Sequence, residues 1–170
     1  MNDTRVTEWD SRSEMLDKLR GKHLLILESG TEGVCAYYQL DLPAGYDDLN
    51  VLIFSTGHRK PSVVWLEPPS RLILACDMFV HKVDLAAKKV EYSKRLDGVF
   101  YEFLSVERTG ACTVLHEIGI VSIEPDGTNK WVVITGIIED FQRNGADSID
   151  LKIMDEEPKA VNLRTGEVKP

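Results

Sequence analysis

Acidic side chains recur at equivalent places in the second half of the sequence and are the first candidates for chemistry. Asp77, Glu117 and Asp155 each follow an apolar segment and stand shortly before a β-branched residue. Carboxylates at one end of neighbouring sheets could bind a cation, an amine or a basic protein surface through charge-assisted hydrogen bonds. The favoured alternative is structural, because acids at strand ends commonly accept backbone N–H bonds in tight turns.

A metal site is a second possibility, because His116 directly precedes Glu117 and Cys76 directly precedes Asp77. Adjacent residues of a strand point to opposite faces, so neither pair can ligate one ion without a bulge. The sequence contains no Cys-x-x-Cys or His-x-x-x-His spacing, and its three cysteines lie far apart. We therefore predict reduced thiols, no metal site and no cofactor.

Motifs of known catalytic sites are also absent from the sequence. It has no Gly-x-Ser-x-Gly elbow, phosphate-binding loop, dinucleotide fingerprint or His-Glu-x-x-His helix. We therefore expect a protein that binds and does not catalyse. A Ser/His/Asp or Cys/His site assembled from distant segments remains the alternative.

Two further groups of residues are candidates for contact with a partner. Glu139 and Asp140 lie in or beside a predicted loop, where charge runs are usually solvated but can steer a basic partner. The consecutive aromatic residues at 37–38 and at 100–101 place one ring on each face of a strand, so one ring of each pair can stay exposed. We take Tyr38 and Tyr101 as the interface members.

The elements that position these residues are mostly strands. One helix is predicted at residues 11–20, because Ser11 and Glu14 have the spacing of a capping box and Gly21 follows. Residues 24–27 and 34–42 are predicted to be two strands of a hairpin, joined by the turn-rich segment 29–33. Polar breaks follow at residues 43–48 and 57–61, and the rest of the chain has the patterns of strands.

From residue 62 onward the sequence repeats with a period of about 40 residues. Each copy has an apolar strand, the acid, a β-branched residue and a tight turn, with a further strand on each side; turns such as the one at residues 67–70 separate them. Four short antiparallel strands in this length are the build of one propeller blade. We predict copies at residues 61–97, 98–135 and 136–170, packed with residues 1–60 into one domain.

The turn Asp126-Gly127 followed by Trp131 resembles the blade repeats of PQQ-type (quinoprotein-like) β-propellers. The resemblance covers residues 62–170, implies a propeller-like construction and carries no catalytic residue. Val90 and Val168 stand where that family has an aromatic residue. Because a closed propeller needs at least four blades, we predict a mainly β fold with an open or incomplete arrangement, in which the helix covers an exposed edge. The alternative is that residues 22–55 form a fourth sheet.

Charge and length restrict the function classes further. The chain has 170 residues and a formal net charge of −8, so it repels polyanions such as nucleic acid and anionic membranes. No apolar run approaches the roughly 20 residues that cross a bilayer. The first ten residues hold no apolar signal segment, which predicts a cytoplasmic location.

From these observations we predict a non-enzymatic acidic module that binds another protein, and we expect the partner to contribute a basic surface. A bacterial immunity protein that neutralises a cognate toxin suits this outline. The alternative is a small-ligand or carbohydrate protein, in which Asp77, Glu117 and His116 supply polar contacts where the sheet ends meet. A third hypothesis is a homodimer formed through open sheet edges.

Overall fold

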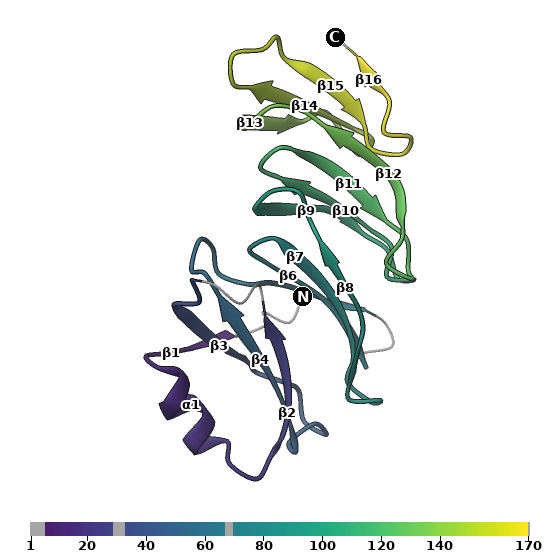
Figure 1. The fold of residues 1–170 in the computed structure, drawn as a ribbon. Helices are drawn as coiled ribbons and strands as arrows, with labels where there is room; N and C mark the ends of the chain where they lie inside the picture. Colours follow the sequence, from purple (N-terminus) through teal and green to yellow (C-terminus); the bar gives the residue numbers. More distant parts are fainter. Residues whose placement is uncertain (1–5, 29–32, 67–69, 170) are drawn as a thin grey trace. The chain divides into compact units, whose positions relative to one another are not determined.

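The computed structural model describes residues 6–28, 33–66 and 70–169. The chain forms two compact units, residues 1–95 and 96–170. The described residues place one helix and two four-stranded sheets in the first unit and two more four-stranded sheets in the second (Figure 1). The boundary expected at residues 60 and 61 falls inside the first unit, between its two sheets. No helix in the described part of the chain is long and apolar enough to cross a membrane.

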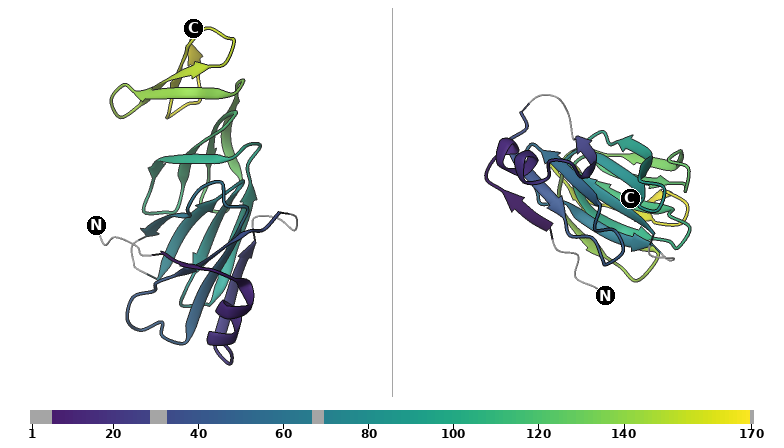
Figure 2. Two further views of the ribbon diagram at one scale, coloured as in Figure 1. Left: turned by 90° about the vertical axis from the view of Figure 1, so that its left-hand side faces the viewer. Right: turned by 90° about the horizontal axis from the view of Figure 1, so that it is seen from below.

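The predicted helix forms as α1, Arg12–Lys18, and Ser11 is its N-cap. The Ser11 hydroxyl accepts a hydrogen bond from the Glu14 backbone N–H at 3.2 Å, as the capping-box spacing predicts. Met15 and Leu19 pack with Leu52 of the first sheet, so the helix lies on a face of that sheet (Figure 2). The expectation that the helix covers an edge is therefore wrong, because its apolar side chains need a face to cover them.

The first sheet has the strand order β1 (Val6–Trp9), β3 (Ala36–Leu40), β4 (Leu49–Ser55), β2 (His23–Glu28). Strand β2 pairs in parallel with β4, so the hairpin predicted between residues 24–27 and 34–42 is wrong. Most of its predicted turn, residues 29–32, lies outside the described residues. Strand β4 takes a central place because it is buried along its whole length. Residues 22–55 thus contribute to a fourth sheet, the alternative that the sequence left open.

The other three sheets are antiparallel throughout, with their strands in chain order. The second sheet has β5 (Ser62–Leu66), β6 (Arg71–Cys76), β7 (Phe79–Asp84) and β8 (Lys89–Arg95). The third has β9 (Phe100–Val106), β10 (Cys112–His116), β11 (Gly119–Ile123) and β12 (Asn129–Ile134). The fourth has β13 (Ile138–Arg143), β14 (Ser148–Ile153), β15 (Lys159–Asn162) and β16 (Val168–Lys169). These sheets confirm three four-stranded, blade-like repeats; residues 67–69 of one predicted turn lie outside the described residues.

Each unit has a core between its two sheets. In the first unit, Val51 and Ile53 of β4 pack with Leu74 of β6, while the alternate residues of β4 face the helix. In the second unit, Leu115 of β10 packs with Leu151 of β14. The repeat therefore marks sheets that bury a face against a neighbouring sheet, as blade-like units must.

Candidate functional site

The Asp77 carboxylate is used inside the first unit. Asp77 lies in the turn between β6 and β7, has a φ of 50° and is 3% exposed. One carboxylate oxygen accepts the Thr56 backbone N–H at 2.7 Å, and the other accepts the Ser55 hydroxyl at 3.2 Å. These bonds join the second sheet to the end of β4 in the first. Asp77 thus fits the structural alternative, with the accepted N–H coming from a neighbouring sheet.

Glu117 is held through its backbone in the turn between β10 and β11. Its amide donates to the Val99 carbonyl at 2.8 Å, and its carbonyl accepts from the Ile138 amide at 2.8 Å. The preceding His116 is 1% exposed, and its Nδ1 has no hydrogen-bond partner among the described residues. Burial lowers the pKa of His116, although the nearby charges of Asp97 and Glu117 oppose that shift. His116 is therefore an interior residue of the second unit.

Asp155 lies in the longer connection between β14 and β15. It is exposed and has a φ of 58°, a conformation that Asp tolerates better than most residues. The adjacent Met154 amide donates to the Ile137 carbonyl at 2.8 Å. Ile137 is followed by Ile138, whose amide donates to the Glu117 carbonyl. The turns of Glu117 and Asp155 therefore lie at one end of the second unit. The structure brings these two predicted acids near one connecting segment, residues 135–138.

Glu139 and Asp140 follow this segment on β13, and both are exposed. A Glu139 carboxylate oxygen lies 2.9 Å from Lys152 Nζ, and this hydrogen bond raises the pKa of Lys152. The Asp140 carboxylate accepts the Phe141 backbone N–H at 2.9 Å. Glu139 and Asp140 therefore come directly after the segment at which the turns of Glu117 and Asp155 meet.

Exposed apolar side chains occupy the same end of the second unit. Ile134, Ile137 and Met154 are 55%, 44% and 43% exposed, respectively. Glu156 lies beside them: a Cβ placed on Gly136 would stand 2.9 Å from its carboxylate oxygen. We call this region the acid-rimmed surface and define it by the residues Glu117, Ile134, Ile137, Glu139, Met154, Asp155 and Glu156.

The apolar residues of the acid-rimmed surface were not predicted from the sequence. Residues 131–138 form an uncharged run, a pattern typical of strand interior. Its Val133 and Ile138 are indeed buried at 7% and 2% exposure, but Ile134 and Ile137 are not covered. The length of this run could have indicated the exposed residues, because the side chains of a run that continues past the end of a strand cannot all enter one core.

The expectation that Tyr38 is exposed is wrong. Tyr38 is 4% exposed and belongs to the core between the first two sheets, and burial raises its pKa. Tyr37, on the other face of β3, packs edge to face on Phe54 with ring centroids 5.5 Å apart. Tyr37 is half-buried there, so the ring chosen for the interface is the more deeply buried of the two. Tyr101 is half-buried against the core of the second unit.

A hollow of about 660 Å³ in the first unit is a separate feature. Its lining includes Lys22, His23, Asp47, Asp48 and Lys88. The Lys88 ammonium donates to the Asp48 carboxylate, and this bond lowers the pKa of Asp48. The residues on which the small-ligand hypothesis was based do not line this hollow. In the described ranges, no three His, Cys, Asp or Glu side chains are grouped to hold a metal ion.

No family model matches the chain, and no curated protein sequence matches it. Among solved structures, the chain is similar to the crystal structure of Myxococcus xanthus glutaminyl cyclase. The two are 12% identical, the match covers 96% of this chain and 73% of the other, and the TM-score is 0.36. A likeness at this level does not bear on function.

Proposed function

We propose that this protein is a non-enzymatic acidic module that binds another protein, and that its acid-rimmed surface contacts a basic region of that partner. The observation that carries the proposal is that one end of the second unit holds three large apolar side chains, each more than 40% exposed, together with four carboxylates. Single exposed apolar residues are ordinary, but a patch with a polar rim is typical of interaction sites.

The two kinds of side chain have different roles in this proposal. Ile134, Ile137 and Met154 provide apolar area whose removal from water contributes affinity. The carboxylates attract a basic partner over a distance and increase its association rate. The ion pair between Glu139 and Lys152 is exposed to water. Glu139 can therefore give up Lys152 at little cost in free energy and pair with a lysine or arginine of the bound protein.

We further propose that the partner is a toxin and that binding in the cytoplasm neutralises it. This role is supported by the size of the chain, its net charge of −8 and its lack of catalytic motifs, since immunity proteins are often small and acidic. Co-expression with the product of an adjacent toxin-like reading frame tests this role. Rescue of growth is expected, and unchanged toxicity would argue against it.

The binding proposal is tested by affinity capture from an extract of the source cell at low salt. The wild-type chain should retain one stoichiometric basic protein, and Ile137→Lys with Met154→Lys should weaken retention at least about tenfold. Ile26→Lys is the matched control, because Ile26 is 40% exposed on β2 of the first unit. The proposal fails if no protein is retained in stoichiometric amount, or if the double variant retains it as well as the control does.

A further inference from the structure

The last strands of the three antiparallel sheets differ in how their edges are protected. Strand β8 carries four charged side chains along Lys89–Arg95, and β16 is only two residues long. Charges and short length are the usual means of preventing an edge strand from pairing with another chain. Strand β12 has neither: Asn129–Ile134 is six residues long and has a single charge, at Lys130.

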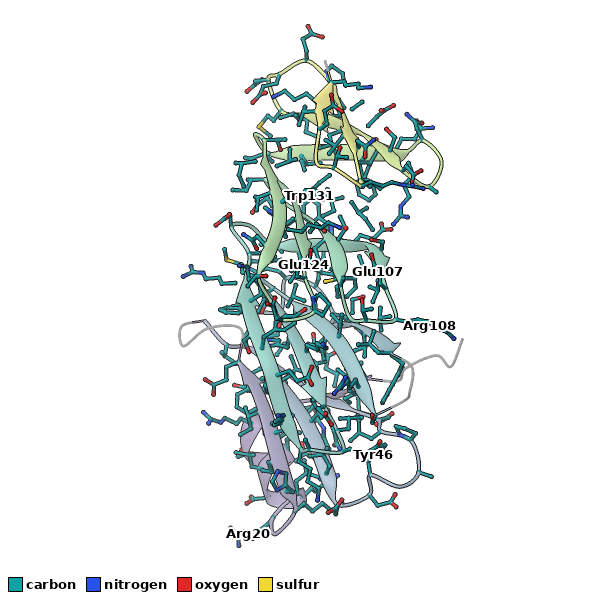
Figure 3. The ribbon with its side chains drawn as sticks, turned by 90° about the vertical axis from the view of Figure 1, so that its right-hand side faces the viewer. Arg20, Tyr46, Glu107, Arg108, Glu124 and Trp131 are labelled. Atoms are coloured by element: carbon teal, nitrogen blue, oxygen red, sulfur yellow. The ribbon has the colours of Figure 1, made fainter. Side chains whose placement is uncertain are left out.

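One face of β12 is fixed to the core, whereas the other face is exposed. Trp131, labelled in Figure 3, and Val133 pack with the core of the second unit. A Cβ on Gly166 would stand 2.8 Å from the Trp131 ring. Val132 and Ile134, which alternate with them, are 39% and 55% exposed. Among the described strands, β12 pairs with β11 alone. Its other edge, with which no described strand pairs, therefore borders an exposed apolar face.

We propose that this edge of β12 accepts an extended segment of the basic partner as a fifth strand of the third sheet; this rests on the proposed function. Backbone hydrogen bonds to a sheet edge supply affinity, and alternate side chains supply specificity. Apolar residues of the segment would cover Val132 and Ile134. Its lysines or arginines would follow at the end beside residues 135–138, where the turn of Glu117 lies.

Charge complementarity favours a partner's segment over a second copy of this chain. Strand β12 leads directly into the acid-rimmed surface, which it shares through Ile134. A second copy would bring a further net charge of −8 and the same carboxylates to the interface. Like charges at an interface disfavour association, whereas a cationic segment meets opposite charge there.

The experiment uses the full chain and a synthetic peptide of alternating valine and threonine that ends in a short lysine stretch. Hydrogen–deuterium exchange should show at least about tenfold slower exchange of β12 amides at saturating peptide. A peptide N-methylated at every residue of the valine–threonine part keeps the side chains but has no backbone N–H to donate along either edge, and a peptide ending in glutamates reverses the charge. Both should bind at least about tenfold more weakly.

Val132→Lys and Ile134→Lys should weaken binding of the peptide that ends in lysines. Val168→Lys is the control and should leave this binding unchanged, because Val168 is 42% exposed on β16 of a different sheet. Equal binding of the N-methylated peptide, or no protection of β12, overturns strand addition. Protection of β12 by self-association without peptide overturns it in favour of a second copy. The capture experiment decides the proposed function separately, since a basic partner can still bind the acid-rimmed surface without adding a strand.

Discussion

The turns of Asp77 in the first unit and Glu117 in the second occupy matching places in the repeat, yet their carboxylates have different surroundings. Asp77 is 3% exposed and accepts hydrogen bonds from Ser55 and Thr56. Glu117 is held by its backbone amide and carbonyl, and its side chain is half-buried. The repeated position therefore marks a turn that docks on a connecting segment, and the neighbouring residues decide whether the carboxylate is used for stability or remains available.

The two units also differ in how they treat their apolar residues. In the first unit the helix covers the second face of β4, so Leu52 and Phe54 are buried. The described part of the second unit has no helix to cover the exposed side of β12 or residues 135–138. Partner binding is therefore proposed for the second unit, because acids and uncovered apolar side chains lie at the same end of it.

Replacing Asp77 by alanine should give the largest loss of stability. The Thr56 amide and the Ser55 hydroxyl would lose a charged acceptor, and bonds of this type contribute about 2 kcal/mol each. Alanine also fits poorly at a φ of 50°. We expect the free energy of unfolding of the first unit to fall by about 4 kcal/mol, measured by urea denaturation.

Asp155 is the matched position for that experiment, because it has a φ of 58° and is exposed. Asp155→Ala should cost only the backbone strain, about 1 kcal/mol, and Asp155→Asn should cost nearly nothing. Equal losses for the two alanine variants would show that turn strain, and not the bonds of Asp77, accounts for the effect.

Acidification should weaken the first unit by a somewhat smaller amount, through His81. This ring is 3% exposed, stacks on Phe79 and has Nδ1 2.8 Å from the Ser93 hydroxyl. Burial lowers its pKa from 6.5 to about 4, so the unfolded chain takes up a proton at higher pH than the folded chain. Stability contributed by neutral His81 is present above about pH 6.5 and is lost as pH falls toward 4, roughly 3 kcal/mol in total.

His81→Gln should remove that part of the acid sensitivity in urea denaturation carried out across this pH range. The exposed His58→Gln is the control and should keep the wild-type dependence. An unchanged slope in His81→Gln would show that other groups account for the loss of stability at low pH.

The repeat architecture was accessible from sequence because each turn needs a local residue pattern. The acid, the β-branched residue and a turn with a residue of positive φ (Lys88, Gly127 and Gly166) recur with the sheets, and three four-stranded sheets result. Pairing in the first sheet was not accessible, because β2 lies beside β4 and not beside β3, which follows it in sequence. Local patterns do not specify such a non-local parallel pairing.

The acids of the candidate site were predictable, and its apolar centre was not. Glu117, Glu139 and Asp155 stand out as charged residues near strand ends, whereas Ile137 resembles any core residue in sequence. Tyr38 shows the opposite error: alternation predicts which residues share a face, but it does not tell whether another sheet covers that face. Exposure depends on tertiary neighbours that a single strand pattern does not contain.

Substitutions at the buried and exposed positions that alternate along β12 give the smallest expected changes in stability. They test directly whether the outer face of this strand is exposed. Val133→Ala removes buried volume from the core of the second unit and should lower the free energy of unfolding by about 2 kcal/mol. Ile134→Ala removes a side chain that is 55% exposed and should change it by less than about 0.5 kcal/mol. Thermal unfolding of both variants is the measurement. A loss for Ile134→Ala as large as that for Val133→Ala would mean that this face of β12 is covered in the folded protein, and the acid-rimmed surface would then not be open to a partner.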